Sequence, residues 1–158
     1  MIPARLRATG LILGTLLVCA ATSAQAQRGP LQQRLAAATA LNCTFSLVST
    51  GTWTKGAPSA ASTPARLTVA FTNINVDEGT ADAQGAFGAS FIVVRQAGDY
   101  LHLMQTYSAG PLYTTTVLAR ETTEGRLMAV HTRHEYTDVA IPGFTSRPEM
   151  YLGECAAK

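Results

Sequence analysis

The chain has 158 residues, of which 47% are hydrophobic and only 14% are charged, with 12 basic residues against 10 acidic ones. Two of the basic residues, Arg5 and Arg7, precede an apolar stretch at the N-terminus, so the rest of the chain is balanced in charge. This balance, without any cluster of Lys and Arg, argues against nucleic acid or an anionic membrane surface as a partner. The length suits one domain with a substantial core.

The N-terminus has the pattern of a secretory signal peptide. Arg5 and Arg7 are followed by the apolar residues 11–21 and then by small residues that end at Ala26, after which we expect cleavage. The apolar run is about half the length that a helix needs to cross a bilayer, and no second such run follows. We therefore expect residues 1–26 to be removed and the mature protein to be periplasmic or secreted, without a membrane span.

A short amphipathic helix is predicted in the lead-in segment 27–42. Leu31 and Leu35 recur at helical spacing within residues 31–41, which are rich in Ala and Gln. Beyond this segment the hydrophobic period changes from that of a helix to two. The sequence thus predicts one β-domain over 43–158.

Alternation of apolar and polar residues predicts about eight strands in the β-domain. They cover residues 43–53, 67–75, 80–83, 90–96, 100–106, 112–119, 126–136 and 149–155. The connections between the central strands have hairpin length, which excludes crossover helices and indicates an antiparallel meander. Two segments rich in small, polar or turn-forming residues, Lys55–Pro64 and Thr137–Arg147, are expected to form exposed loops.

The two cysteines outside the leader, Cys43 and Cys155, lie at opposite ends of the β-domain. In an exported chain such a pair most simply forms a disulfide, and two cysteines allow only one pairing. A disulfide needs its Cα atoms within roughly 4.4–6.8 Å of each other, so the first strand must lie beside the last. We therefore predict an all-β fold in which the meander closes as a small barrel or half-barrel, with the helix over one mouth. A β-sandwich is the alternative.

One strand carries two of the three histidines, His131 and His134. Residues three apart on a strand point to opposite faces, so these two imidazoles cannot chelate one metal ion unless a bulge intervenes. We expect no metal site here. The same alternation groups His131 with Arg133 and Glu135, and places His134 on the other face with Met128.

Which of these two faces points inward is an open question for the sequence. We expect the more apolar face, with Met128 and Val130, to be interior, so that His134 projects into a cavity and His131 and Arg133 are solvated. In the alternative, His131 and Arg133 lie inside the barrel as polar anchors for the carboxylate or polar head of a ligand.

A second group of candidate ligand-binding residues, Tyr100, His102 and Met104, shares one face of the strand over 100–106. If that face points inward, these residues would line one cavity together with Met128 and His134 and could hold an apolar ligand. A haem fits less well because the sequence has no axial-ligand motif, and we expect no cofactor.

The C-terminal third resembles a group of small exported bacterial proteins without assigned function. The resemblance rests on Thr114–Val117, Gly125, Ala129–His134 and the terminal Gly153-x-Cys155. It implies export and a β-rich fold, and it transfers no catalytic residue.

A second resemblance, to lipocalin-type barrels, rests on Gly51-Thr52-Trp53 on an early strand, an N-terminal helix and a strand count near eight. It implies a barrel that binds a ligand, by analogy of fold. No GxSxG elbow and no Ser-His-Asp order is present, so the sequence offers no catalytic residues. We expect a binding module for a small, mostly apolar ligand. The alternatives are a structural or interaction protein of the cell envelope and, less well supported, a hydrolytic or redox enzyme using His131 and His134.

Overall fold

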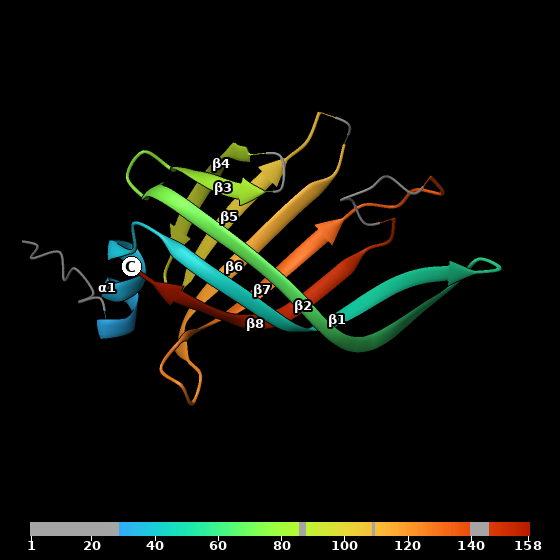
Figure 1. Ribbon diagram of the computed structural model, residues 1–158, viewed down its shortest axis with the longest axis horizontal. Coiled ribbons are helices and arrows are strands. Elements are labelled where there is room, and N and C mark those ends of the chain that lie inside the picture. Colours follow the sequence, from blue (N-terminus) through green and yellow to red (C-terminus); the bar gives the residue numbers. More distant parts are fainter. Residues whose placement is uncertain (1–28, 86–87, 109, 140–145) are drawn as a thin grey trace, which may run out of the picture.

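The computed structural model describes residues 29–85, 88–108, 110–139 and 146–158, and the predicted signal peptide lies outside these ranges. Over these ranges the fold is all-β, with one short helix and eight strands (Figure 1). The elements are α1 Pro30–Ala37, β1 Leu41–Thr54, β2 Ala57–Asn75, β3 Thr80–Gly85, β4 Gly88–Ala97, β5 Tyr100–Thr106, β6 Leu112–Glu121, β7 Leu127–His134 and β8 Glu149–Ala157.

The predicted antiparallel meander and its closure are confirmed. Each strand pairs with its neighbour in sequence, and β1 also pairs with β8, so the sheet closes into a ring and the sandwich alternative is wrong. Cys43 and Cys155 are direct partners across this closing seam and form a disulfide, with their Cα atoms 4.0 Å apart. Both cysteines are buried in the interior of the ring.

The segment Lys55–Pro64, predicted as a loop, is instead mostly strand. Only Lys55 and Gly56 form the turn, with φ values of 52° and 82°, and the register of β1 with β2 starts at the next pair, Thr54 with Ala57. A two-residue turn with positive φ at both positions matches the right-handed twist of the flanking strands, so the hairpin continues to its tip. The resulting ribbon projects beyond the ring (Figure 1).

The prolines of the ribbon are compatible with this strand because of their position. Pro58 and Pro64 lie on β2, which pairs with β3 only from Ala70 onward among the described residues. The outer edge of β2 therefore lacks a partner along the ribbon, and an edge strand tolerates residues without an amide hydrogen. Prolines on such an edge also oppose pairing with another chain.

Helix α1 covers one end of the ring, as predicted, but it is shorter than expected because Leu41 already begins β1 (Figure 1). Leu35 is completely buried, and the helix packs against β5 and β6. On its outer side Arg34 forms an ion pair with Glu121 and donates a hydrogen bond to the carbonyl of Gly125. We call this end, where β1 begins and β8 ends, the closed end, and the opposite end the open end.

The interior of the closed end is apolar and tightly packed. Its buried residues alternate along the strands and include Leu41, Ile92, Val94, Leu101, Leu103, Val117, Leu127 and Ala129, together with the disulfide. Gly153 lets β8 approach β1, because a Cβ at this position would lie 2.0 Å from the Thr44 carbonyl oxygen and 2.6 Å from the Cα of Phe45. No helix in the described part of the chain is long and apolar enough to cross a membrane.

Candidate functional site

The burial of β7 decides which of its faces is interior. Leu127, Ala129 and His131 are buried, whereas the Met128 side chain is 38% exposed. The expectation that Met128 faces the interior is therefore wrong, and the alternative orientation, with His131 and Arg133 inside, is the one observed. The reason is that Leu127 and Ala129 complete the packing of the closed end, which places every second residue of the strand inside.

The other predicted site residues lie on the outer surface of the ring. Tyr100, His102 and Met104 alternate with Leu101 and Leu103, which are buried. On this outer face the Tyr100 and His102 rings stack with centroids 6.0 Å apart, and His102 Nδ1 lies 3.0 Å from the hydroxyl of Thr116.

The remaining predicted residue on β7, His134, is also exposed and contacts the hydroxyl of Thr132. The proposed interior cavity of Tyr100, His102, Met104, Met128 and His134 therefore does not form. Of the seven predicted residues, the structure brings only His131 and Arg133 together inside the ring.

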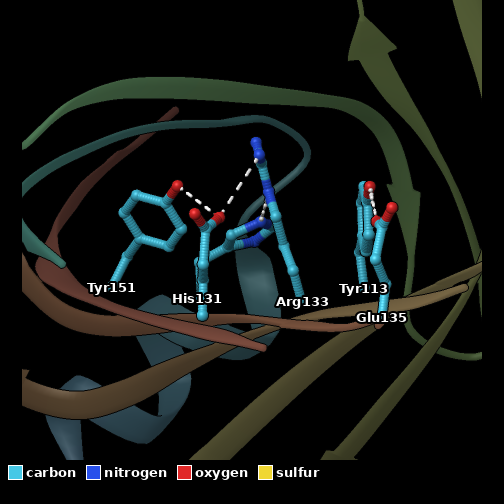
Figure 2. Close-up of polar contacts among 6 residues, drawn as sticks. Tyr113, His131, Arg133, Glu135 and Tyr151 are labelled. Atoms are coloured by element: carbon cyan, nitrogen blue, oxygen red, sulfur yellow. Dashed lines mark hydrogen bonds and ion pairs between the residues drawn. The ribbon is translucent and has the colours of Figure 1, made fainter. Parts of the chain in front are cut away.

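At the open end of the interior, Arg133 is held by its neighbours on β6, β7 and β8 (Figure 2). Its guanidinium carbon lies 5.2 Å from the ring centroid of Tyr113 and 5.4 Å from that of Tyr151, so a cation–π contact is made on each side. Nε donates a hydrogen bond to Nε2 of His131 over 3.3 Å, and Nη1 lies 3.7 Å from a carboxylate oxygen of Glu149. We call these five residues the Arg133 cluster.

His131 is neutral in this setting. Its Nε2 accepts from Arg133, so the ring proton is assigned to Nδ1, which donates to the hydroxyl of Thr115 over 2.8 Å. Burial, and then the nearby Arg133 charge, lower the pKa of His131 from its ordinary value of 6.5 to about 4. The imidazole is thus a fixed acceptor for the guanidinium at neutral pH.

Each of the two tyrosines in the cluster donates to a carboxylate. The Tyr151 hydroxyl donates to Glu149 over 2.7 Å, and the Tyr113 hydroxyl donates to Glu135 over 2.6 Å (Figure 2). Burial and the hydrogen bond to Glu149 raise the pKa of Tyr151 to about 12, and burial with the Glu135 contact raises the pKa of Tyr113 further. Both phenols therefore stay protonated and continue to donate hydrogen bonds to Glu149 and Glu135.

A cavity of about 340 Å³ lies next to the Arg133 cluster, inside the open end. One wall comes from β2, β3 and β4 and is mostly small or apolar, and the other comes from β5, β6, β7 and the start of the β5–β6 connection and is polar. The lining residues are Leu67, Thr68, Val69, Ala83, Gln84, Gly85, Gly88, Ser90, Gln105, Tyr107, Tyr113, His131 and Arg133. Arg133 is the only charged residue among them.

A larger hollow, of about 630 Å³, lies at the outer faces of β8, β1 and β2. It is lined in part by Leu47 and Leu152, which are exposed, and by Arg66 and Glu154. It lies outside the ring, whereas the smaller cavity is interior and adjoins the Arg133 cluster, so the smaller cavity is the better candidate for a binding site. In the described part of the chain, no three His, Cys, Asp or Glu side chains group as ligands for a metal ion.

Sequence reasoning missed three residues of the site, Tyr113, Glu149 and Tyr151. The sequence did contain a clue to Glu149 and Tyr151. If the disulfide closes the barrel from within, then every second residue of the same strand, counted from the cysteine, also points inward. Cys155 therefore implies that Tyr151 and Glu149, four and six residues earlier, face the interior too.

No protein-family model, curated protein or solved structure matches this chain. The two resemblances noted from the sequence therefore stay predictions. What the fold and the site define is a class: a disulfide-linked ring of eight antiparallel strands that is packed at one end and hollow at the other.

Proposed function

We propose that this protein is an exported binding module that takes a small, mostly apolar ligand into the open end of its barrel. The observation that carries the proposal is the interior cavity of about 340 Å³, which falls within the roughly 300–1,000 Å³ usual for small-molecule sites. Leu67, Val69 and Ala83 supply an apolar wall for the body of a ligand. The buried disulfide supports an oxidising compartment outside the cytoplasm.

The architecture suits this role because one end of the ring is packed and the other contains a cavity. In the part of the chain that the structure describes, helix α1 and the apolar residues around Leu101 fill the closed end, so we expect a ligand to enter at the open end. Proteins bind ligands in the mouths of β-barrels where the interior is incompletely filled.

Native mass spectrometry of the mature protein purified from the periplasm tests the proposal. We expect a small molecule that is retained in the native spectrum and lost on denaturation, and saturable binding of the neutral apolar fluorophore N-phenyl-1-naphthylamine to the delipidated protein. A protein that retains nothing and does not bind the fluorophore would overturn the proposal.

Two adjacent residues on β4 provide a matched pair of variants. Ser90 lines the cavity, whereas Ala89 is exposed on the outer face of the same strand. Ser90→Phe should fill the cavity and abolish fluorophore binding, and Ala89→Phe should leave binding unchanged. Equal losses in both variants would argue against an interior site.

The alternative, a non-catalytic interaction protein, is favoured by one observation on the outer surface. Phe91 is 75% exposed on β4, two residues from Val93, which is also exposed. Exposed apolar side chains that adjoin one another mark contact surfaces. If the cavity tests fail, loss of an envelope partner on Phe91→Ser would favour this second function.

A further inference from the structure

We propose that the ligand is an amphipathic monocarboxylic acid whose carboxylate docks on the guanidinium of Arg133. This inference rests on the proposed function and adds the chemical class of the ligand. It follows from the hydrogen-bond donors of Arg133, from how the guanidinium is positioned, and from the charges around it.

Most N–H groups of the Arg133 guanidinium make no hydrogen bond to a described residue. Of its five N–H groups, only Nε donates a hydrogen bond to a described residue, His131, because the distance of 3.7 Å from Nη1 to Glu149 is too long for one. The Arg133 side chain is only 18% exposed, yet it lines the cavity. We call the two Nη groups the fork of Arg133. A mostly buried arginine whose fork makes no hydrogen bond is suited to a carboxylate, which it binds through two parallel hydrogen bonds.

The fork is also fixed in place before any ligand arrives. The rings of Tyr113 and Tyr151 flank the guanidinium, and His131 holds its Nε end (Figure 2). Figure 2 shows the Nη atoms as the part of Arg133 that reaches farthest from β7. Such preorganisation reduces the entropy that a ligand loses on binding.

The neighbouring carboxylates limit the charge of the ligand. Glu149 accepts a hydrogen bond from Tyr151 and lies 3.7 Å from Nη1 of Arg133, beyond hydrogen-bonding distance, and Glu135 accepts a hydrogen bond from Tyr113. Neither carboxylate lines the cavity. They nevertheless make the surroundings negative enough to oppose a second negative charge at short range. A monoanionic carboxylate therefore fits better than a dianionic phosphate.

The rest of the cavity limits the body of the ligand. Leu67, Val69 and Ala83 form an apolar wall among the lining residues, and the cavity of about 340 Å³ has the volume of roughly eleven water molecules at about 30 Å³ each. The space suits an acid with a short or medium apolar chain. Arg133 would hold the head, and the apolar wall would bury the chain.

The test compares decanoic acid with 1-decanol, which has the same chain without the charge, in displacing N-phenyl-1-naphthylamine. We expect the wild-type protein to bind the acid about 10- to 100-fold more tightly than the alcohol, since a charge-assisted bidentate contact is worth that much. Arg133→Gln should remove this preference, so that the acid and the alcohol bind with similar affinity. Arg133→Lys, which keeps the charge and loses the fork, should retain only part of it.

Glu149→Gln gives a second test with the opposite sign. It removes the negative charge nearest to Arg133 and leaves an amide oxygen that Tyr151 can still hydrogen-bond, so acid binding should tighten several-fold. If Arg133 and Glu149 formed only a structural ion pair, this substitution would not tighten binding. The matched control is Arg120→Gln, which removes an exposed arginine on β6 that does not line the cavity and should change neither affinity.

The outcomes separate this inference from the proposed function. Fluorophore binding that Ser90→Phe abolishes, without any preference of the wild type for the acid, would overturn the ligand class and leave the binding module in place. Tighter binding of decyl phosphate than of decanoate would overturn the inference that the ligand carries a single negative charge. Equal weakening of acid and alcohol by both Arg133 variants would show that Arg133 shapes the cavity and does not dock the head.

Discussion

The two halves of the barrel interior are built in opposite ways. In the closed half, Leu41, Leu101 and Leu127 are completely buried around a disulfide, and α1 covers them. In the open half, Arg133, the neutral His131 and Tyr113 line a cavity, and Glu135, Glu149 and Tyr151 lie beside them. We therefore expect the apolar half to contribute most of the stability of the fold, and the open half to contribute the polar groups of the binding site.

This division has a physical basis in the cost of burying charge. Placing Arg133 and Glu149 in a partly buried site costs desolvation free energy, which their mutual attraction offsets only in part. The apolar half and the covalent closure of the ring compensate for that cost. Variants that affect one half should therefore change the free energy of unfolding most, and variants of the other half should change binding most.

The largest expected effect is loss of the disulfide that closes the ring. Cys43 and Cys155 are separated by 112 residues, for which the chain-entropy model gives a stabilisation of about 4–5 kcal/mol. The double variant Cys43→Ala/Cys155→Ala should lose that much in urea unfolding at neutral pH. A loss below about 1 kcal/mol would mean that the strand pairing of β1 with β8 closes the ring without help.

A matched pair of leucines compares the two halves directly. Leu101 is completely buried in the closed half, whereas Leu67 is only partly buried and lines the cavity. Leu101→Ala should lower the free energy of unfolding by about 2–5 kcal/mol, as expected for a new void in a packed core. Leu67→Ala should cost less than half as much in the same unfolding experiment. Equal costs would contradict the contrast between the halves.

The neutral His131 makes the open half sensitive to acid. Its pKa in the folded protein, about 4, is lower than the ordinary 6.5, so the unfolded chain binds the proton first. The contribution of neutral His131 to the free energy of unfolding is fully present above pH 6.5. It is lost as the pH falls from 6.5 towards 4, by up to about 3 kcal/mol.

The measurement is urea unfolding at pH 7.5 and pH 4.5 for the wild type and His131→Gln. Carboxylates titrate over part of this range in both proteins, so the difference between them isolates the histidine. We expect the wild type to lose more stability than the variant. Identical losses would mean that His131 is not buried in its neutral form.

The smallest effect is expected outside the ring, on the ribbon. Trp53 is 50% exposed and contacts the Tyr136 ring edge-to-face, with centroids 5.4 Å apart. Trp53→Ala should change the melting temperature little, since such a pair contributes about 0.5–1.5 kcal/mol, and should leave fluorophore binding unchanged. Weakened binding would show that the ribbon takes part in the open end.

The sequence by itself determined the course of the chain. Alternating residues located all eight strands, and the placement of Cys43 and Cys155 required the first strand to meet the last. The error at Lys55–Pro64 arose because small residues and prolines are typical of loops, whereas the turn at Lys55 and Gly56 and an unpaired edge allow them in a strand.

Only the tertiary structure decided which face of β7 is interior. Both faces of β7 carry apolar residues, Leu127 and Ala129 on one and Met128 and Val130 on the other, so its alternation shows which residues share a face but does not show which face is inside. Closure of the ring settles this, because the face that meets Cys155 and the other strands becomes the core. The Arg133 cluster likewise gathers residues from β6, β7 and β8, and their proximity depends on strand register, which no local pattern of residues contains.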